Sequence, residues 1–403
     1  MDLRSSQSFW PIQDGLIATY PPLESNESCD VLVTGAGITG ALVADRLARS
    51  GLNVIVLDRR DVAHGSTAAS TALLQYEIDT PLVALREQVP PGHADRAYLL
   101  GVEAIRTLAQ RCAELADSSG FRPAQSLYLA HNNRAADRLQ REAEARQAIG
   151  IDARYLDADS VYTRCGIPCA GAIVSAVAAT VNPYRLTHAL LADAVQRGVR
   201  VYDQTEVRGR RADREGLVVT TDRDFTVRCR HMVYATGYEA QGLLKQKDVA
   251  LTSTFAIATE PIRDLGAFGD AAILWTTEAP YFYARTTADH RVIAGGADVR
   301  FRNPPARDRL VERKAGQIEA QLRRWLPGLR FERRYAWAGT FSSTRDGLAY
   351  IGAHPEHPCC FFALGYGGNG ITYSVIAAQM LNDLIHGRLN ADADIFRFER
   401  HGT

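Results

Sequence analysis

The feature that most constrains this chain is a glycine-rich turn between an apolar run and a helical segment. Gly35, Gly37 and Gly40 fit the spacing Gly-x-Gly-x-x-Gly directly after the apolar run 29–34. Residues 38–50 then show helical spacing, and 53–57 form a second apolar run. A strand, a glycine turn, a helix and a second strand within about 30 residues predict one βαβ unit. The chain should therefore contain an α/β domain.

Each glycine of this turn has its own physical task. Gly35 permits the tight turn, Gly37 lets a pyrophosphate approach the backbone, and Gly40 allows close packing of helix and strand. The N-terminus of the helix then offers free N–H groups to the anion. Asp58 ends the second apolar run, where its carboxylate can accept hydrogen bonds from a ribose. The segment therefore predicts that the chain binds a dinucleotide.

Composition excludes several other classes of protein. The 403 residues carry 46 basic and 46 acidic side chains, so the basic surface that nucleic-acid binding needs is not expected. No apolar run approaches the ~18 residues of an integral membrane helix. The first residues lack the apolar stretch of a secretory signal, and seven cysteines without CxxC spacing fit a reducing compartment. We expect a cytoplasmic protein, with no role assigned to Cys165, Cys169, Cys359 or Cys360.

The remaining segments alternate between helical and strand-like patterns. Residues 1–28 are predicted to form an extended N-terminal arm. Helical spacing covers 38–50, 93–117, 134–149, 185–197, 307–326 and 371–386. Strands are predicted at 29–34, 53–57, 198–202, 217–221, 225–227, 231–234, 251–259, 271–275, 281–286, 291–296 and 360–364. Strand–helix alternation at both ends, with successive strands between, predicts an α/β domain that hosts a separate antiparallel sheet.

Several ordered segments make the chain resemble a known family. Besides 30–40, these are the segments 64–67, 181–186, 235–237, 258–261, 295–296, 337–347 and 365–370. In this order they resemble the D-amino-acid oxidase superfamily of FAD-dependent oxidoreductases. The nearest likeness is to glycine/sarcosine oxidase-like and γ-glutamylputrescine oxidase-like proteins.

The resemblance implies a Rossmann-like FAD-binding domain that is interrupted by an antiparallel-sheet substrate domain. In this sequence the FAD-binding domain would comprise 29–90, 155–245 and 330–403, and the substrate domain 91–154 and 246–329. The glycine run 365–370 would open a helix whose N-terminus faces the flavin and stabilises negative charge on it. The implied cofactor contacts are Gly35, Gly37, Ile38, Thr39, Gly40, Asp58, Arg59, Gly65, Ser66, Thr67, Thr71, Val207, Ala235, Thr236, Gly237, Gly339, Asp346, Gly367, Gly368, Asn369, Gly370 and Ile371.

Two departures from the family pattern bear on chemistry. Sarcosine-type oxidases tether the flavin through a cysteine at the position of Gly339, so non-covalent FAD is expected here. Glycine oxidase-like enzymes place a carboxylate-binding arginine at the position of Phe341. An aromatic residue there suits an amine or an apolar group better than an α-carboxylate. Arg285 is either an alternative anion clamp or part of the sheet scaffold.

The sequence does not identify the catalytic residues. His64, Tyr283, Arg285 and Phe341 are candidates, and Tyr76 and Glu77 are candidate pocket residues that could equally pack in the core. None of Lys245, Lys247 and Lys314 lies in a segment expected near the flavin, so the electron acceptor could be O2 or another compound. The histidines show no metal-ligand spacing, and no metal site is predicted.

The resemblance implies an enzyme with a small-molecule substrate. The expected reaction is oxidation of a C–N bond in a small amine or amino acid, with hydride transfer to flavin N5 and hydrolysis of the resulting imine. Two alternatives remain open. One is an FAD-dependent dehydrogenase of a hydroxy acid or polyol, and the other is a flavoprotein subunit of a larger dehydrogenase.

Overall fold

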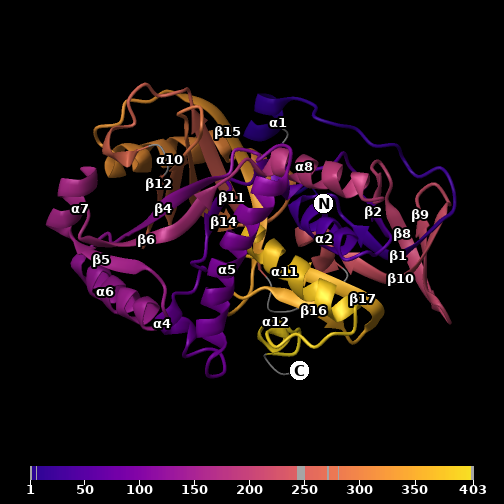
Figure 1. Cartoon of the computed structure of the whole chain (residues 1–403). Coiled ribbons are helices and arrows are strands. Elements are labelled where there is room, and N and C mark those ends of the chain that lie inside the picture. The colour runs from indigo at the N-terminus through magenta and orange to yellow at the C-terminus, as the bar shows by residue number, and fades with distance from the viewer. Residues whose placement is uncertain (1, 6, 243–249, 270–271, 280, 401–403) are drawn as a thin grey trace.

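The chain folds around two β-sheets, as the computed structural model in Figure 1 shows. The structure describes residues 2–5, 7–242, 250–269, 272–279 and 281–400. The first sheet has eight strands in the order β16-β17-β10-β1-β2-β7, with β9 paired to β10 and β8 to β9. Their bounds are β1 Glu27–Thr34, β2 Val54–Leu57, β7 Arg200–Tyr202, β8 Val207–Asp213, β9 Gly216–Thr221, β10 Thr226–Tyr234, β16 Tyr350–His354 and β17 His357–Leu364.

The centre of this sheet is parallel, as the βαβ unit predicts. Strand β1 pairs in parallel with β2 and with β10, and β10 pairs in parallel with β17. Helices α2 (Ile38–Arg49), α8 (Pro183–Gln196) and α11 (Gly370–Ile385) lie side by side, with α2 in contact with both of the others. Alternate residues of β1 enter different cores: Val31 and Val33 pack with these helices, and Leu32 packs in the core on the other face. Burial on both faces explains the continuous apolar runs of these strands.

The second sheet has nine strands in the order β15-β11-β14-β13-β12-β4-β6-β3, with β5 paired to β6. All of its pairs are antiparallel except the parallel pair of β4 and β12, which joins the two halves. The bounds are β3 Leu73–Gln75, β4 Arg122–Leu129, β5 Ala153–Asp157, β6 Gly171–Thr180, β11 Ala250–Thr259, β12 Ala272–Thr276, β13 Phe282–Thr286, β14 Val292–Arg300 and β15 Arg333–Ser343. These findings confirm the predicted α/β fold with a second sheet.

The remaining helices connect and cover the two sheets. Helix α5 (His93–Glu114) contacts α11 as well as β3 and β6, and Figure 1 shows it between the two sheets. Helix α10 (Val311–Trp325) packs on β11, β14 and β15. The others are α1 Phe9–Asp14, α3 Ser66–Ala69, α4 Leu82–Leu85, α6 Asn133–Ala148, α7 Ala158–Cys165, α9 Pro304–Asp308, α12 Ala393–Phe396 and the 3-10 helices η1 Gly237–Gly242 and η2 Gly266–Phe268. None of the helices in the described ranges is long and apolar enough to span a membrane.

The N-terminal segment differs from the predicted extended arm. It contains α1, whose Phe9 and Trp10 are buried in the main core. The Trp10 indole donates to the carbonyl of Ser70, and Arg4 forms a bridge with Gly339 of β15. The segment is therefore packed against the rest of the protein, since burial of Phe9 and Trp10 offsets the entropy that is lost when it becomes ordered.

Strand membership also differs from the predicted domain ranges at four places. The nine-stranded sheet includes β3, β5, β6 and β15. The predicted ranges had placed these strands, apart from the first two residues of β5, in the FAD-binding domain. The strands that were not predicted at all are β3, β4, β5, β6, β8, β15 and β16. Long-range pairing decides them, because their residues have no strict alternation of apolar and polar side chains. The division into domains itself stays a prediction.

Candidate active site

One cavity of about 660 Å³ connects the two sheets. That volume is in the usual range for cofactor and ligand sites. Its walls include the glycine turn after β1, the ends of β2 and β10, the start of α11, and residues of β11, β12, β13 and β15. We call the polar and aromatic lining residues from the end of β3 to Asp79, and those between the start of β11 and the end of β13, the distal wall. The distal wall comprises Gln75, Glu77, Asp79, Thr254, Trp275, Tyr281 and Tyr283.

The glycine turn has the geometry that its sequence predicts. Gly35 has φ of +103°, and a Cβ there would lie 2.5 Å from the carbonyl oxygen of Ala235. A Cβ at Gly40 would lie 1.7 Å from the carbonyl oxygen of Gly35. The Ile38 N–H donates to Thr67 Oγ1 over 3.0 Å, so the segment after β2 closes on the turn. Only glycine fits at positions 35 and 40, and the turn leaves its backbone open to the cavity.

Asp58 anchors the other side of the turn. Its carboxylate accepts hydrogen bonds from the N–H of Ala36 (2.7 Å) and the N–H of Arg60 (2.8 Å). Burial raises the pKa of the Asp58 carboxyl, and these two hydrogen bonds oppose the rise. Arg59 pairs with Glu239 of η1 over 2.5 Å. The carboxylate therefore orders the turn as well as facing the cavity.

Three buried hydroxyl groups on the cavity wall have no hydrogen-bond partner within the protein. They are Ser66 Oγ, Thr236 Oγ1 and Tyr366 OH. Buried polar groups are normally hydrogen-bonded, so unpartnered ones that line a cavity suit a polar ligand. With the open backbone of the glycine turn, they fit a dinucleotide that extends along this wall.

Most predicted site residues meet in this cavity. Those that line it are Gly35, Gly37, Ile38, Thr39, Asp58, Arg59, Gly65, Ser66, Thr67, Thr71, Val207, Ala235, Thr236, Gly237, Tyr283, Gly339, Phe341, Gly367, Gly368, Asn369, Gly370 and Ile371. Four do not line it: Gly40, His64, Arg285 and Asp346. Gly40 lies beneath the glycine turn, where the absence of a side chain lets α2 pack closely against β1.

Asp346 and His64 have other surroundings. The Asp346 carboxylate pairs with Arg400 over 2.8 Å and accepts the N–H of Leu348, so it ties the C-terminal segment to the loop before β16. His64 lines a second, smaller cavity beside Arg4, and its ring meets Tyr184 edge-on with centroids 5.7 Å apart. The structure thus places both residues outside the cofactor cavity.

Arg285 lies in the core. Its guanidinium donates to the carbonyl of Ala72 over 3.0 Å and lies over the Trp10 ring at 5.3 Å. Burial lowers the pKa of Arg285 to about 9, helped by the neighbouring charge of Arg122. These contacts fit the scaffold interpretation, in which Arg285 links the N-terminal segment to β13.

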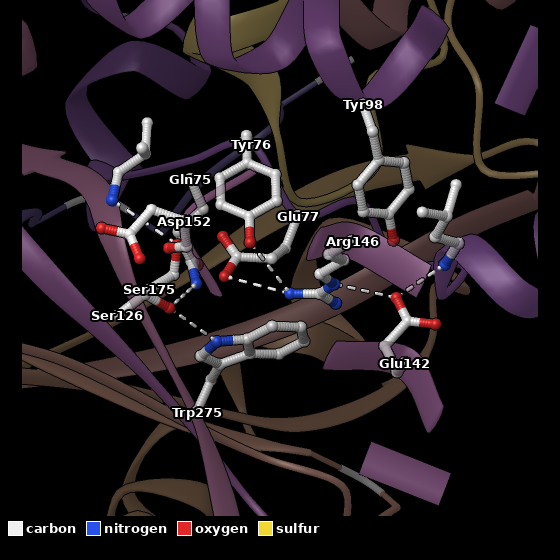
Figure 2. Close-up of polar contacts among 12 residues, drawn as sticks. Gln75, Tyr76, Glu77, Tyr98, Ser126, Glu142, Arg146, Asp152, Ser175 and Trp275 are labelled. Atoms are coloured by element: carbon white, nitrogen blue, oxygen red, sulfur yellow. Dashed lines mark hydrogen bonds and ion pairs between the residues drawn. The ribbon is translucent and has the colours of Figure 1, made fainter. Parts of the chain in front are cut away.

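The cavity is also lined by four residues that no sequence pattern predicted: Asp79, Gln75, Trp275 and Tyr238. Figure 2 shows how two of them are held: Ser126 Oγ accepts hydrogen bonds from Trp275 Nε1 (3.0 Å) and from Gln75 Nε2 (3.2 Å). The Trp275 ring also stacks on Tyr128, with centroids 3.5 Å apart. The pairing of β4 with β12 brings these residues together, and no local pattern shows it.

Glu77 reaches the cavity from a buried charged cluster. Figure 2 shows Arg146 between Glu77 Oε1, at 3.4 Å, and Glu142 Oε1, at 2.9 Å. The other oxygen of Glu77 has no partner within the protein. Burial raises the pKa of the Glu77 carboxyl, and the charge of Arg146 opposes the rise. Tyr76, the other candidate pocket residue, packs beside Arg146 in the core.

Lys314 and the one group of potential metal ligands that the described structure brings together lie outside the cavity. Lys245 and Lys247 lie outside the described residues, and Lys314 is on α10 near the Phe255 ring. Within the described ranges, His354, Glu356 and His357 place potential metal ligands within 4.8 Å of one another. Arg210 donates to Nδ1 of His357 over 2.6 Å, and its positive charge disfavours a cation there. The expectation of no metal site stays a prediction.

A sheet with a parallel centre and a glycine turn, opening into a cavity that continues to a second sheet, is typical of proteins that bind a dinucleotide beside a second compound. The family model described as FAD dependent oxidoreductase, DAO, matches residues 30–384. The chain belongs to this family, and its cofactor is FAD. Gly339 lines the cavity without a side chain, so this position offers no covalent tether.

Two relatives are similar to this chain in sequence, and two solved structures are similar to it in fold. The chain is 25% identical to glycine oxidase of Geobacillus kaustophilus, with 92% of this chain and 97% of that protein covered. It is 24% identical to gamma-glutamylputrescine oxidoreductase of Escherichia coli (95% and 89%). The glycine oxidase crystal structure from G. kaustophilus has a TM-score of 0.76 at 22% identity (91% and 96%). The structure of L-amino acid deaminase from Proteus myxofaciens has a TM-score of 0.79 at 15% identity, with 100% of this chain and 98% of that chain covered.

The buried carboxyl of Asp298, which is close enough to Tyr281 and Tyr283 to act on them through its charge, allows a test of how burial raises a pKa near the distal wall. Burial raises the pKa of this carboxyl from 3.8 to about 6. A raised acid pKa lowers stability once the group ionises, so the wild type should lose stability between about pH 4 and pH 6. Asp298→Asn should therefore stabilise the holoenzyme at neutral pH by about 1–2 kcal/mol, and by nearly nothing near pH 4. Thermal unfolding at both pH values measures the difference.

The matched control for this prediction is Asp394→Asn. The Asp394 side chain is 76% exposed, so its removal should have little effect at either pH. A stabilisation by Asp298→Asn that is equal at both pH values would contradict the assignment, because the penalty would then not come from ionisation.

Proposed function

We propose that the protein oxidises the C–N bond of a small amine or amino acid. When bound, FAD accepts a hydride, and with it two electrons, from the carbon beside the nitrogen. The nitrogen gives up a proton to water, and the imine that results is hydrolysed to a carbonyl compound and a free amine or ammonia. The proposal needs the protein to position the C–H bond and to limit access of water, and it needs no strong base if the amine reacts as the neutral form.

One observation carries this proposal: the same cavity contains the dinucleotide-binding turn and the distal wall. Gly37 and Trp275 both line it, although Gly37 follows β1 of the eight-stranded sheet and Trp275 belongs to β12 of the nine-stranded sheet. A compound held on the distal wall is therefore in the same enclosed space as the cofactor. Holding two reactants together in this way supplies much of the rate advantage of an enzyme.

The start of α11 would supply the electrostatic part. Its first residues, Gly370 and Ile371, line the cavity, and the N-terminus of a 16-residue helix carries partial positive charge. The Asn369 side chain donates to the carbonyls of Gln75 (3.1 Å) and Glu77 (2.6 Å). The loop before α11 is thereby tied to the distal wall, so the helix terminus is fixed relative to the substrate.

The test is anaerobic reduction of the purified holoenzyme with a panel of amines, amino acids and hydroxy acids. We expect a C–N compound to bleach the visible flavin absorption, with ammonia or an amine as product. Bleaching by hydroxy acids alone would replace the proposal with the dehydrogenase of a C–OH substrate. Bleaching by no compound, in a protein that retains FAD, would favour the subunit alternative.

The absence of a side chain at Gly339 gives a second expectation. Acid precipitation of the holoenzyme should leave all of the flavin in the supernatant, because no group at this position can bond to it. The absorption of pellet and supernatant measures the partition. Flavin that stays with the denatured protein would show a covalent attachment elsewhere in the chain.

A further inference from the structure

Charge is distributed unevenly along the cofactor cavity. The arginines that line it in the described residues are Arg59, Arg60, Arg208 and Arg210, which follow β2 or lie on β8 of the eight-stranded sheet. The distal wall contains Glu77 and Asp79 and, among the described residues, no arginine or lysine. Binding of a carboxylate would require a cation on this wall, since burying an unpaired charge is costly.

Asp79 is the acidic group that is free to meet a ligand. Its side chain is open to the cavity, and one oxygen accepts the N–H of Gly368 over 3.2 Å. No lysine or arginine in the described part of the chain forms an ion pair with it. Burial of its surroundings raises the pKa of the Asp79 carboxyl, and the Gly368 hydrogen bond opposes the rise. A cation beside this carboxylate would favour its charged form.

Aromatic rings lie beside the same carboxylate. A Cβ at Gly368 would be 3.2 Å from Asp79 Oδ1 and 3.7 Å from the Tyr281 hydroxyl, so both groups flank one glycine. The Tyr281 and Tyr283 rings are tilted against each other, with centroids 5.8 Å apart. Aromatic faces attract ammonium groups, and they also accept an alkyl chain.

Two further carboxylates reinforce the negative potential. Asp298 is repelled by Asp79 and acts on Tyr281 and Tyr283 through its charge, which Lys314 partly offsets, and its Oδ1 atom has no partner within the protein. Glu77 has one oxygen on Arg146 and the other unpartnered. Like charges gathered at one wall destabilise the ligand-free protein, and a bound cation relieves that repulsion.

We propose that the distal wall selects an organic cation without an α-carboxylate, with Asp79 as its counter-ion and Tyr281 and Tyr283 as its aromatic surface. The substrate class is then an alkylamine or diamine rather than an amino acid. A monoamine bound as an ammonium ion must pass one N–H proton to the Asp79 carboxylate before it reacts as the neutral form, whereas a diamine can be bound through one nitrogen and oxidised beside the other. This inference rests on the proposed function, because it assumes that the distal wall holds the compound to be oxidised. Phe341 on the neighbouring β15 adds an apolar surface to the same space.

The test uses three compounds of one shape that cannot be oxidised at the carbon beside the functional group. They are tert-butylammonium chloride, tert-butanol and sodium pivalate, titrated into the holoenzyme at constant ionic strength while the flavin spectrum is recorded. We expect saturable binding of the ammonium ion, and binding at least 10-fold weaker for the alcohol and for the carboxylate. Binding that is as tight for pivalate, or tighter, would overturn the proposal.

Variants assign the effect to Asp79. Asp79→Asn should weaken ammonium binding at least 10-fold and leave pivalate binding unchanged or improved, whereas Asp79→Glu should retain part of the affinity. The exposed Glu144→Gln is the control, and FAD content and thermal midpoint report whether each variant is folded. Unchanged ammonium affinity in a folded Asp79→Asn protein would remove Asp79 as the counter-ion. Tyr281→Leu gives an independent reading, with a loss of affinity that Tyr281→Phe should not show.

The outcomes separate this inference from the proposed function. Preference for pivalate, together with oxidation of amino acids, would support C–N oxidation and contradict the proposal that the distal wall selects a cation. Ammonium binding that depends on Asp79, without oxidation of any amine, would support cation binding at the distal wall and contradict the proposed reaction.

Discussion

Gly40→Ala should yield a protein that does not bind FAD. A Cβ at this position would lie 1.7 Å from the carbonyl oxygen of Gly35, which is backbone and cannot turn away. Either α2 must separate from β1 or the glycine turn must open, and both changes displace the N–H groups that would bind the pyrophosphate. We expect a loss of FAD affinity of at least 100-fold, measured as flavin absorbance per mole of purified protein and by titration with added FAD.

The control for this prediction is Gly316→Ala on α10. A Cβ there meets nothing within 4 Å, and alanine favours a helix more than glycine does by about 1 kcal/mol, so stability should be equal or higher. Gly37→Ala is an intermediate case, since its Cβ would meet only the Thr67 side chain, at 3.0 Å. Full FAD content in Gly40→Ala would show that the helix and strand can shift without loss of the site.

The cofactor half of the cavity could be predicted because its chemistry is local. Gly35, Gly37 and Asp58 belong to one βαβ unit, whose turn geometry follows from glycine spacing. The small residues after β10 and before α11 could be placed once the family resemblance supplied the order of the segments. Asp346 was predicted as a cofactor contact but lies outside the cavity, because Arg400 binds its carboxylate from 54 residues away.

The distal wall could not be predicted in the same way. Asp79 follows a three-residue strand, and its neighbour Gly368 lies 289 residues further on. Trp275 reaches the wall through the parallel pairing of β4 with β12, a register that no sequence pattern indicates. The sequence did predict the strand 281–286, which contains Tyr281 and Tyr283, and made Tyr283 a candidate site residue. Their meaning changed only when the acidic residues of other elements proved to lie beside them.

Arg146→Met should be the most destabilising substitution near the site. Arg146 is fully buried between the Tyr76 and Tyr98 rings, each 5.5 Å from the guanidinium carbon, and it pairs with Glu77 and Glu142 (Figure 2). Glu142 in turn accepts the N–H groups of Leu82 and Val83 at the start of α4. Removing the cation leaves two buried carboxylates uncompensated, which costs about 3–5 kcal/mol. The thermal midpoint of the holoenzyme should fall by roughly 4–6 °C, because the unfolding entropy of a chain of this length is large.

The pH dependence identifies the cause of this loss. Without Arg146, both carboxylates should bind protons more readily in the folded protein than in the unfolded one, so the deficit should shrink as the pH falls from 8 towards about 5. Arg141→Met makes the same chemical change at an exposed position of the same helix and should shift the midpoint little at any pH. A triple variant with Glu77→Gln and Glu142→Gln should recover part of the stability, since neutral amides need no counter-ion. A deficit that stays constant with pH would point instead to lost packing between the two tyrosine rings, and the charge of Arg146 would then not be what holds Glu77 at the cavity.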